Sequence, residues 1–193
     1  MDAQQKRNFV IVGHAQCGKT SLAESILFIS GATSRKGTVN DGNTLSDYSS
    51  EEIERKISIS SSVLISNYQG SQIQFIDTPG YADFAGEVIA SLRAVDAALI
   101  VIDAISGIEV GTESIWQMLE ELAIPRFIFV NKMDKEGADF NKSFLEIKDN
   151  LSKKAVAIDS LSSPQLIEAV AETDDKLLEK YLETGALSEE ELF

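Results

Sequence analysis

The sequence predicts a three-layer α/β/α fold with a mostly parallel sheet and one antiparallel strand in an edge hairpin. Apolar runs typical of strands alternate with helical patterns along the chain, which favours a largely parallel sheet. The runs at 97–102 and 127–130 are continuously apolar, as in strands that helices cover on both faces. Alternating apolar residues at 57–65, a turn-like segment at 67–70 and a second strand pattern at 72–77 together predict the hairpin.

The other elements follow in chain order. Phe9–Val12 is the first strand, and apolar residues at helical spacing after it predict a helix that stops at Gly31. The polar segment 32–56 is long for a structureless loop, and loops of that length tend to be functional. The remaining patterns predict helices at 84–93, 112–123 and 140–151, a short strand at 154–158, and acidic helical sequence from Pro164 onward.

Length and composition indicate one domain that spans residues 1–193. Cys17 is the one cysteine, so no internal disulfide can form, and a reducing compartment is expected. No stretch approaches the ~20 apolar residues of a membrane span, so we expect a cytoplasmic protein with no membrane partner. The formal net charge of −14 argues against direct nucleic-acid binding by this chain, because phosphate contacts need an excess of Lys and Arg.

The segment after the first strand carries the strongest motif. It fits G-x-x-x-x-G-K-[ST] between a strand and a helix, which is the context of a phosphate-binding P-loop and predicts a P-loop NTPase. Its glycines let the backbone approach phosphate oxygens, and its N–H groups can form an anion-binding nest. We expect Lys19 to reach the β- and γ-phosphates and the Thr20 hydroxyl to hold Mg²⁺. The nucleotide-binding residues predicted here are Gly13, His14, Ala15, Gln16, Cys17, Gly18, Lys19, Thr20 and Ser21.

A second motif, Asp77-Thr78-Pro79-Gly80, follows the second hairpin strand. An aspartate at a strand end can join the metal's shell, here through water, and the N–H of Gly80 can turn toward a γ-phosphate. Such a turn is common by itself, but its place ~60 residues after a P-loop makes it specific. It predicts nucleotide contacts from these four residues and from Tyr81.

A third motif, Asn131-Lys132-Met133-Asp134, follows the strand at 127–130. The Asp134 carboxylate can accept hydrogen bonds from N1–H and the 2-amino group of guanine, whereas adenine offers neither donor. Asn131 can tie the segment back to the P-loop, and the stem of Lys132 can lie over the base. In register with the other two motifs, this one predicts GTP and GDP as the ligands.

Together these motifs resemble the translational GTPases, and elongation factor G most closely. The likeness is carried by residues 18–27, 77–80, 83–84, 131–140 and 179–183, and it covers nearly the whole chain but only the GTP-binding (G) domain of that family. The resemblance implies a Mg²⁺-dependent GTPase that converts GTP to GDP and phosphate, slowly without a partner, and acts on the ribosome. It also implies a first switch at 32–56 and a second switch at 78–86.

The first switch of that family ends in Arg-Gly-Ile-Thr, and its threonine touches Mg²⁺. The matching residues here are Arg55-Lys56-Ile57-Ser58. Ser58 keeps the hydroxyl, so the resemblance implies Thr20, Ser58 and Asp77 as the metal-binding residues. Lys56 replaces glycine and makes the loop stiffer and more basic.

The chain departs from the family pattern at two further site positions. Gln16 replaces an aspartate that helps to hold a monovalent cation, and Tyr81 replaces a histidine that orients the attacking water. The residues expected to carry catalysis are therefore Lys19, Gly80 and Tyr81. Tyr81 stands at the position that orients water, but we expect it to do so weakly, because a phenol stays neutral at pH 7. His14, the one histidine, is interpreted as a structural residue of the loop.

The end of the chain also departs from the family, which has an inserted subdomain and then a Ser-Ala loop that contacts guanine O6. Either Asp159-Ser160-Leu161 is a degenerate form of that loop, or the true loop lies outside this chain; we favour the second and expect 159–193 to be a truncated or shortened helical part. Two other functions stay open: a GTP-state-sensing binding module with negligible hydrolysis, and a truncated fragment with weak nucleotide binding.

Overall fold

The computed structural model describes residues 6–158 and 163–188. The chain divides into two compact units, Met1–Ser143 and Phe144–Phe193, which are described one at a time. Helix α5 (Phe140–Asn150) begins in the first unit and continues into the second.

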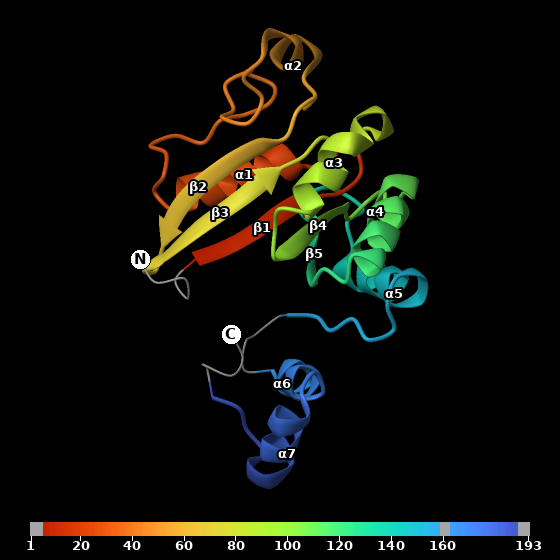
Figure 1. Ribbon diagram of the computed structural model, residues 1–193. Coiled ribbons are helices and arrows are strands. Elements are labelled where there is room, and N and C mark those ends of the chain that lie inside the picture. Colours follow the sequence, from red (N-terminus) through yellow and green to blue (C-terminus); the bar gives the residue numbers. More distant parts are fainter. Residues whose placement is uncertain (1–5, 159–162, 189–193) are drawn as a thin grey trace. The chain divides into compact units, whose positions relative to one another are not determined.

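A five-stranded sheet forms the centre of the first unit (Figure 1). Strand β1 pairs in parallel with β3 and β4, β4 pairs in parallel with β5, and β2 pairs antiparallel with β3, so the order is β2-β3-β1-β4-β5. The mostly parallel sheet with an antiparallel edge hairpin is confirmed. The strands are β1 (Lys6–Val12), β2 (Ser62–Tyr68), β3 (Ser71–Asp77), β4 (Ala97–Asp103) and β5 (Arg126–Asn131).

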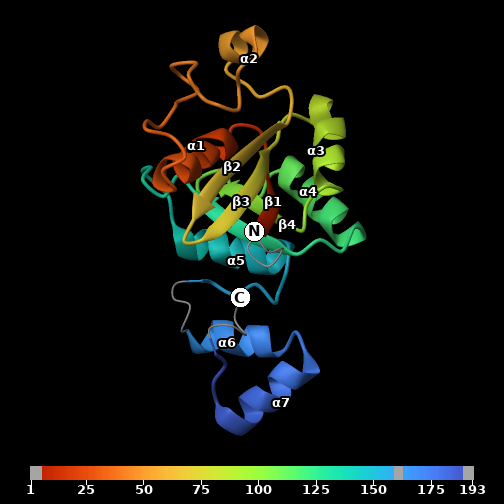
Figure 2. The ribbon, with the colours of Figure 1, turned by 60° about the vertical axis from the view of Figure 1, so that its left-hand side comes forward.

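Helices cover both faces of this sheet, which confirms the three-layer arrangement (Figure 2). On one face, Ala23 and Leu27 of α1 (Lys19–Ile29) belong to a buried cluster with Ile11 and Phe75. The alternate β1 side chains, Val10 and Val12, are also fully buried and point to the opposite face. That face carries α3 (Ala85–Leu92), which follows the 3-10 helix η2 (Ala82–Phe84), and α4 (Val110–Glu121).

The prediction that 127–130 is a strand buried on both faces was wrong. Among the described residues β5 pairs only with β4, and the Phe127 and Phe129 side chains are 57% and 40% exposed. The predicted strand at 154–158 is irregular. A short apolar run does not distinguish a central strand from an edge strand, because that depends on whether a further strand follows in the sheet.

The hairpin begins later than its alternating pattern indicated. Strand β2 starts at Ser62 rather than at Ile57, because the preceding backbone bonds to a side chain instead of a neighbouring strand. The amides of Ile59 and Ser60 donate to the Glu52 carboxylate, at 3.0 and 3.1 Å. The turn is the pair Gln69-Gly70, with φ of +47° and +82°, as in tight two-residue hairpins.

The second unit contains the acidic helices expected from Pro164 onward. They are α6 (Pro164–Ala171), which Ser163 caps, and α7 (Asp175–Thr184), which begins after Asp174 and ends at left-handed Gly185. The predicted base-loop candidate Asp159-Ser160-Leu161 lies outside the described residues. Throughout the described ranges, no helix is long and apolar enough to cross a membrane.

Two buried glutamates hold the segment 32–56. Glu24 of α1 is 1% exposed, and its carboxylate accepts from the amides of Gly37 (2.9 Å) and Leu45 (2.6 Å). Glu52 lies in the short helix α2 (Ser50–Arg55) and forms a capping box with Ser49. Burial opposes ionisation of Glu52, but its backbone hydrogen bonds outweigh burial and lower its pKa. The segment is therefore anchored by charged hydrogen bonds rather than by apolar packing.

We predict that Glu24→Ala releases this segment while the sheet stays folded. Losing two hydrogen bonds to a charged group removes ~3 kcal/mol of local stability, so the Gly37 and Leu45 amides should exchange ~100-fold faster with deuterium. Mass-spectrometric hydrogen exchange measures this directly. Glu54→Ala, at an exposed position of the same segment, is the matched control and should leave exchange unchanged. Equal exchange in both variants would show that Glu24 is no anchor.

Candidate functional site

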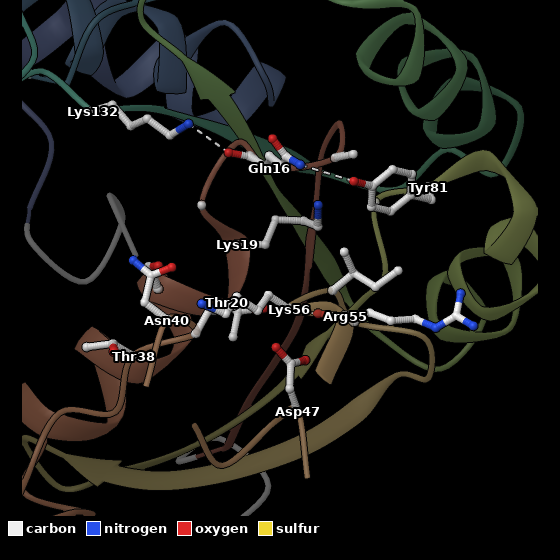
Figure 3. Close-up of a pocket in the computed structure, with 17 residues that line it drawn as sticks. Gln16, Lys19, Thr20, Thr38, Asn40, Asp47, Arg55, Lys56, Tyr81 and Lys132 are labelled. Carbon is white, nitrogen blue, oxygen red and sulfur yellow. Dashed lines mark hydrogen bonds between the residues drawn. The ribbon is translucent and has the colours of Figure 1, made fainter. Parts of the chain in front are cut away.

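A cavity of about 580 Å³ lies where the carboxyl ends of the parallel strands meet (Figure 3). Four segments far apart in sequence contribute to it: the loop between β1 and α1, the first switch, the loop after β3 and the loop after β5. The predicted site residues that line the cavity are Ala15, Gln16, Gly18, Lys19, Thr20, Ser21, Ser58, Gly80, Tyr81 and Lys132.

Lys19 is the central charge of the cavity. It is 6% exposed, and its ammonium group donates to the carbonyl oxygens of Gly13 (3.0 Å) and His14 (2.8 Å). A Cβ at Gly80 would overlap the Lys19 ammonium and would lie 2.8 Å from the His14 oxygen. Glycine at position 80 therefore allows the second-switch backbone to approach the loop and its lysine closely.

Oxygen atoms gather beside Lys19. The Thr20 hydroxyl donates to Asp77 Oδ2 at 2.8 Å and lies 3.2 Å from the Ser58 hydroxyl. The other Asp77 oxygen, Oδ1, is buried and has no hydrogen-bond partner among the described residues. Burial raises the pKa of Asp77 from its usual 3.8 to about 6, although the Thr20 hydrogen bond opposes the rise.

Asp47 adds a second buried carboxylate to this corner. It lines the cavity, it is 4% exposed, and neither of its oxygens has a hydrogen-bond partner in the described part of the chain. Burial raises its pKa, and its charge contributes to the raised pKa of Asp77. Hydroxyl and carboxylate oxygens are the ligands that Mg²⁺ prefers. A cation would also offset the cost of burying the Asp47 and Asp77 carboxylates close to each other. The residues present therefore fit Mg²⁺.

The third motif is joined to the P-loop by two side chains. The Asn131 amide donates to the Cys17 carbonyl at 2.9 Å, the tie expected of this residue. Lys132 donates to the Gln16 carbonyl at 2.7 Å and pairs with Asp103 at 2.5 Å. Burial opposes ionisation of Asp103, but the Lys132 hydrogen bond helps to hold its pKa below the usual range. Met133 and Asp134 are exposed and do not line the cavity.

Several predicted nucleotide-binding residues lie behind the cavity and shape its loops. The Thr78 hydroxyl donates to the Ile11 carbonyl at 2.8 Å, and Pro79 beside it is also buried. His14 faces Glu109 at the start of α4, with 3.4 Å between Nε2 and Oε1. Cys17 is 1% exposed, and burial raises the pKa of its thiol although Lys19 is near, so the thiol stays protonated.

Two departures from the family pattern contact each other. The Gln16 side-chain amide donates to the Tyr81 hydroxyl at 3.1 Å, as Figure 3 shows. This hydrogen bond joins the P-loop to the second switch across one side of the cavity. The Tyr81 hydroxyl accepts this hydrogen bond, so its own proton stays free to donate.

Sequence reasoning missed part of the cavity lining, namely Thr38, Val39, Asn40 and Asp47 of the first switch. The Thr38 hydroxyl donates to Asp41 at 2.7 Å within a local turn. A local pattern does not show which distant loop a turn approaches. The buried state of Asp47 likewise arises from tertiary contacts alone.

This fold and this site define a class: a P-loop nucleotide-binding G domain. Residues 4–189 match the family described as the elongation factor Tu GTP binding domain, so the chain belongs to that family of translational GTPase domains.

The fold is also similar to the crystal structure of a protein from Thermus thermophilus, ttk003000868. The TM-score is 0.83, and the sequences are 30% identical over 96% of this chain. The match covers 34% of the Thermus protein, so this chain spans about a third of its length.

We predict that Asp77→Asn stabilises the nucleotide-free domain near neutral pH. Because burial raises the pKa of Asp77 to about 6, ionising it destabilises the native state, an effect absent below the unfolded pKa of 3.8 and complete above 6. The variant should therefore gain ~3 kcal/mol of unfolding free energy at about pH 7.5, and the gain should shrink as the pH falls toward 4. Urea denaturation across this pH range measures the difference, and a gain that is independent of pH would contradict the prediction.

Proposed function

We propose that this chain is the GTP-binding and GTP-hydrolysing domain of an elongation factor G-like translational GTPase that acts on the ribosome in the cytoplasm. The observation that carries the proposal is that Lys19 and Thr20 of the P-loop, Ser58 of the first switch and Gly80 of the second switch line one cavity. The Ser58 hydroxyl lies 3.2 Å from that of Thr20, and Gly80 packs against the Lys19 ammonium. A γ-phosphate bound there would contact all three segments, which is how such a domain changes shape with nucleotide state.

In this proposal, Lys19 binds the β- and γ-phosphates, and the backbone N–H of Gly80 donates to the γ-phosphate. Mg²⁺, when bound, would be held by Thr20, Ser58 and Asp77, the last through water, and would neutralise phosphate charge. Water attacks the γ-phosphorus, the bond to the β-phosphate oxygen breaks, and GDP and phosphate leave. Tyr81 is the residue proposed to orient that water.

Base selection is assigned to the third motif. Asn131 donates to the Cys17 carbonyl and Lys132 to the Gln16 carbonyl, so both residues are held against the P-loop. Asp134, two residues further on, therefore follows a segment that is fixed at the edge of the cavity. We propose that Asp134, exposed in this structure, accepts the two guanine donors when nucleotide is bound.

One observation favours a second candidate function. The Gln16 amide holds the Tyr81 hydroxyl toward the P-loop and takes one of its acceptor positions. If this restraint weakens water orientation, the domain binds GTP and acts as a sensor of nucleotide state with negligible hydrolysis.

The two functions are separated by measuring GTP and GDP affinity with and without Mg²⁺, then single-turnover hydrolysis with and without ribosomes. Tight binding with turnover supports the enzyme, and tight binding without turnover supports the sensor. Weak binding of both nucleotides would contradict both functions and support the remaining alternative, a truncated fragment with weak nucleotide binding.

The base assignment leads to a specificity prediction. Asp134→Asn should weaken GTP binding by ~3 kcal/mol, because a charged bidentate acceptor is lost. It should also shift preference toward xanthine nucleotides, whose C2 oxygen can accept from the new amide. Calorimetric titration of GTP and XTP into both proteins tests this, and unchanged GTP affinity would refute the role of Asp134.

A further prediction concerns Tyr81. Tyr81→His should raise ribosome-stimulated hydrolysis ~10²-fold with little change in GTP affinity, because imidazole orients water better and titrates near neutral pH. Tyr81→Phe, the matched variant without the hydroxyl, should hydrolyse no faster than the parent. If Tyr81→Phe abolished a rate that the parent clearly has, the hydroxyl itself would be catalytic.

A further inference from the structure

Lys56 occupies a backbone conformation that glycine usually adopts. It is the C-cap of α2, with φ 56° and ψ 39°, in the left-handed region. A side chain there crowds the following carbonyl, which is why helices so often end in glycine at such a point. A strained residue persists where surrounding structure or function requires it, and Lys56 lies at the edge of the nucleotide cavity.

Lys56 is exposed, and it is one of the residues that line this cavity. In Figure 3 the side chains of Lys56 and the neighbouring Arg55 extend in opposite directions. Strand β2 begins only at Ser62, so Lys56 and Ser58 belong to one short connection from α2 that faces the P-loop.

The Lys56 ammonium also differs from the other ammonium groups around the cavity. Lys19 donates to two carbonyl oxygens, and Lys132 is paired with Asp103. Within the described residues, the Lys56 side chain has no hydrogen bond or ion pair. It is an uncompensated positive charge, at the end of a flexible four-carbon stem, at the edge of a cavity whose proposed ligand carries several negative charges.

We propose that Lys56 is a further phosphate-binding residue, which binds the phosphate chain of the nucleoside triphosphate and holds the first switch closed over it. The inference rests on the proposed function of the site. Charge-assisted hydrogen bonds to phosphate oxygens are about twice as strong as neutral ones and weaken with added salt. The lysine would thus connect α2 to the ligand from the side opposite Lys19.

The test compares Lys56→Gln with Lys56→Arg, and with Lys36→Gln as the matched control. Lys36 lies in the same segment, is exposed and does not line the cavity, so its substitution changes net charge equally. We expect Lys56→Gln to weaken Mg²⁺-GTP binding ~10-fold at low salt, with a smaller loss for GDP, because a charged contact to phosphate is removed. The difference from the parent should shrink as salt is raised to roughly 0.5 M, where screening is strong. Lys56→Arg should retain most of the affinity, and Lys36→Gln all of it.

A second measurement separates phosphate binding from a merely structural role. Lys56→Gly relieves the left-handed strain, so it should raise the thermal midpoint of the nucleotide-free domain by roughly 2–4 °C while it weakens GTP binding like Lys56→Gln. Equal GTP affinity in the parent and Lys56→Gln at every salt concentration, or an equal loss in Lys36→Gln, would overturn the inference and leave the proposed function intact. A parent that fails to bind GTP would instead refute the proposed function.

Discussion

The buried ammonium group of Lys19 is the constraint on which the rest of the site depends. A charge that is 6% exposed must be surrounded by oxygen atoms, and the loop supplies the carbonyls of Gly13 and His14. The loop takes this course at Gly13, where φ is +151° and a Cβ would overlap the Val101 carbonyl. A residue with a side chain would not fit there, so glycine allows the two carbonyls to converge. Gly80 then approaches from the second switch. The cavity that Lys19 lines is where we propose that the phosphates bind.

The order of the strands explains why residues so far apart meet there. Strands β1 and β3 are neighbours and parallel, so the P-loop and Asp77 leave the sheet at the same edge and Thr20 can bond to Asp77. Strand β4 delivers Asp103 and β5 delivers Asn131, and both are tied to the P-loop, Asp103 through Lys132 and Asn131 through the Cys17 carbonyl. The parallel sheet thus places motifs that are far apart in sequence side by side at one edge.

The sequence was sufficient for those features that depend on local chemistry. The P-loop, the hairpin and the alternation of strands and helices follow from glycine placement and hydrophobic periodicity, and all of them are present. It was insufficient where tertiary neighbours determine burial and strand limits. Strand β5 lies at an edge, with Phe127 and Phe129 exposed. Strand β2 starts later than its pattern indicated, because the Glu52 carboxylate binds the backbone that precedes it. The burial of Asp47 had no signal at all, since a lone aspartate in a polar loop is ordinarily solvated.

The first switch is firmly anchored, and it also lines much of the cavity. Glu24 and Glu52 hold its backbone through N–H groups, so the segment is ordered by the protein itself. Its side chains that face the cavity include Asp47, Lys56 and Ser58, a carboxylate, an ammonium and a hydroxyl. Asp47 is buried without a hydrogen-bond partner in the described chain, which destabilises the unliganded state, and a bound cation would relieve that cost. In the proposed function, affinity for the nucleotide and the position of the switch would therefore be coupled through the same few charged groups.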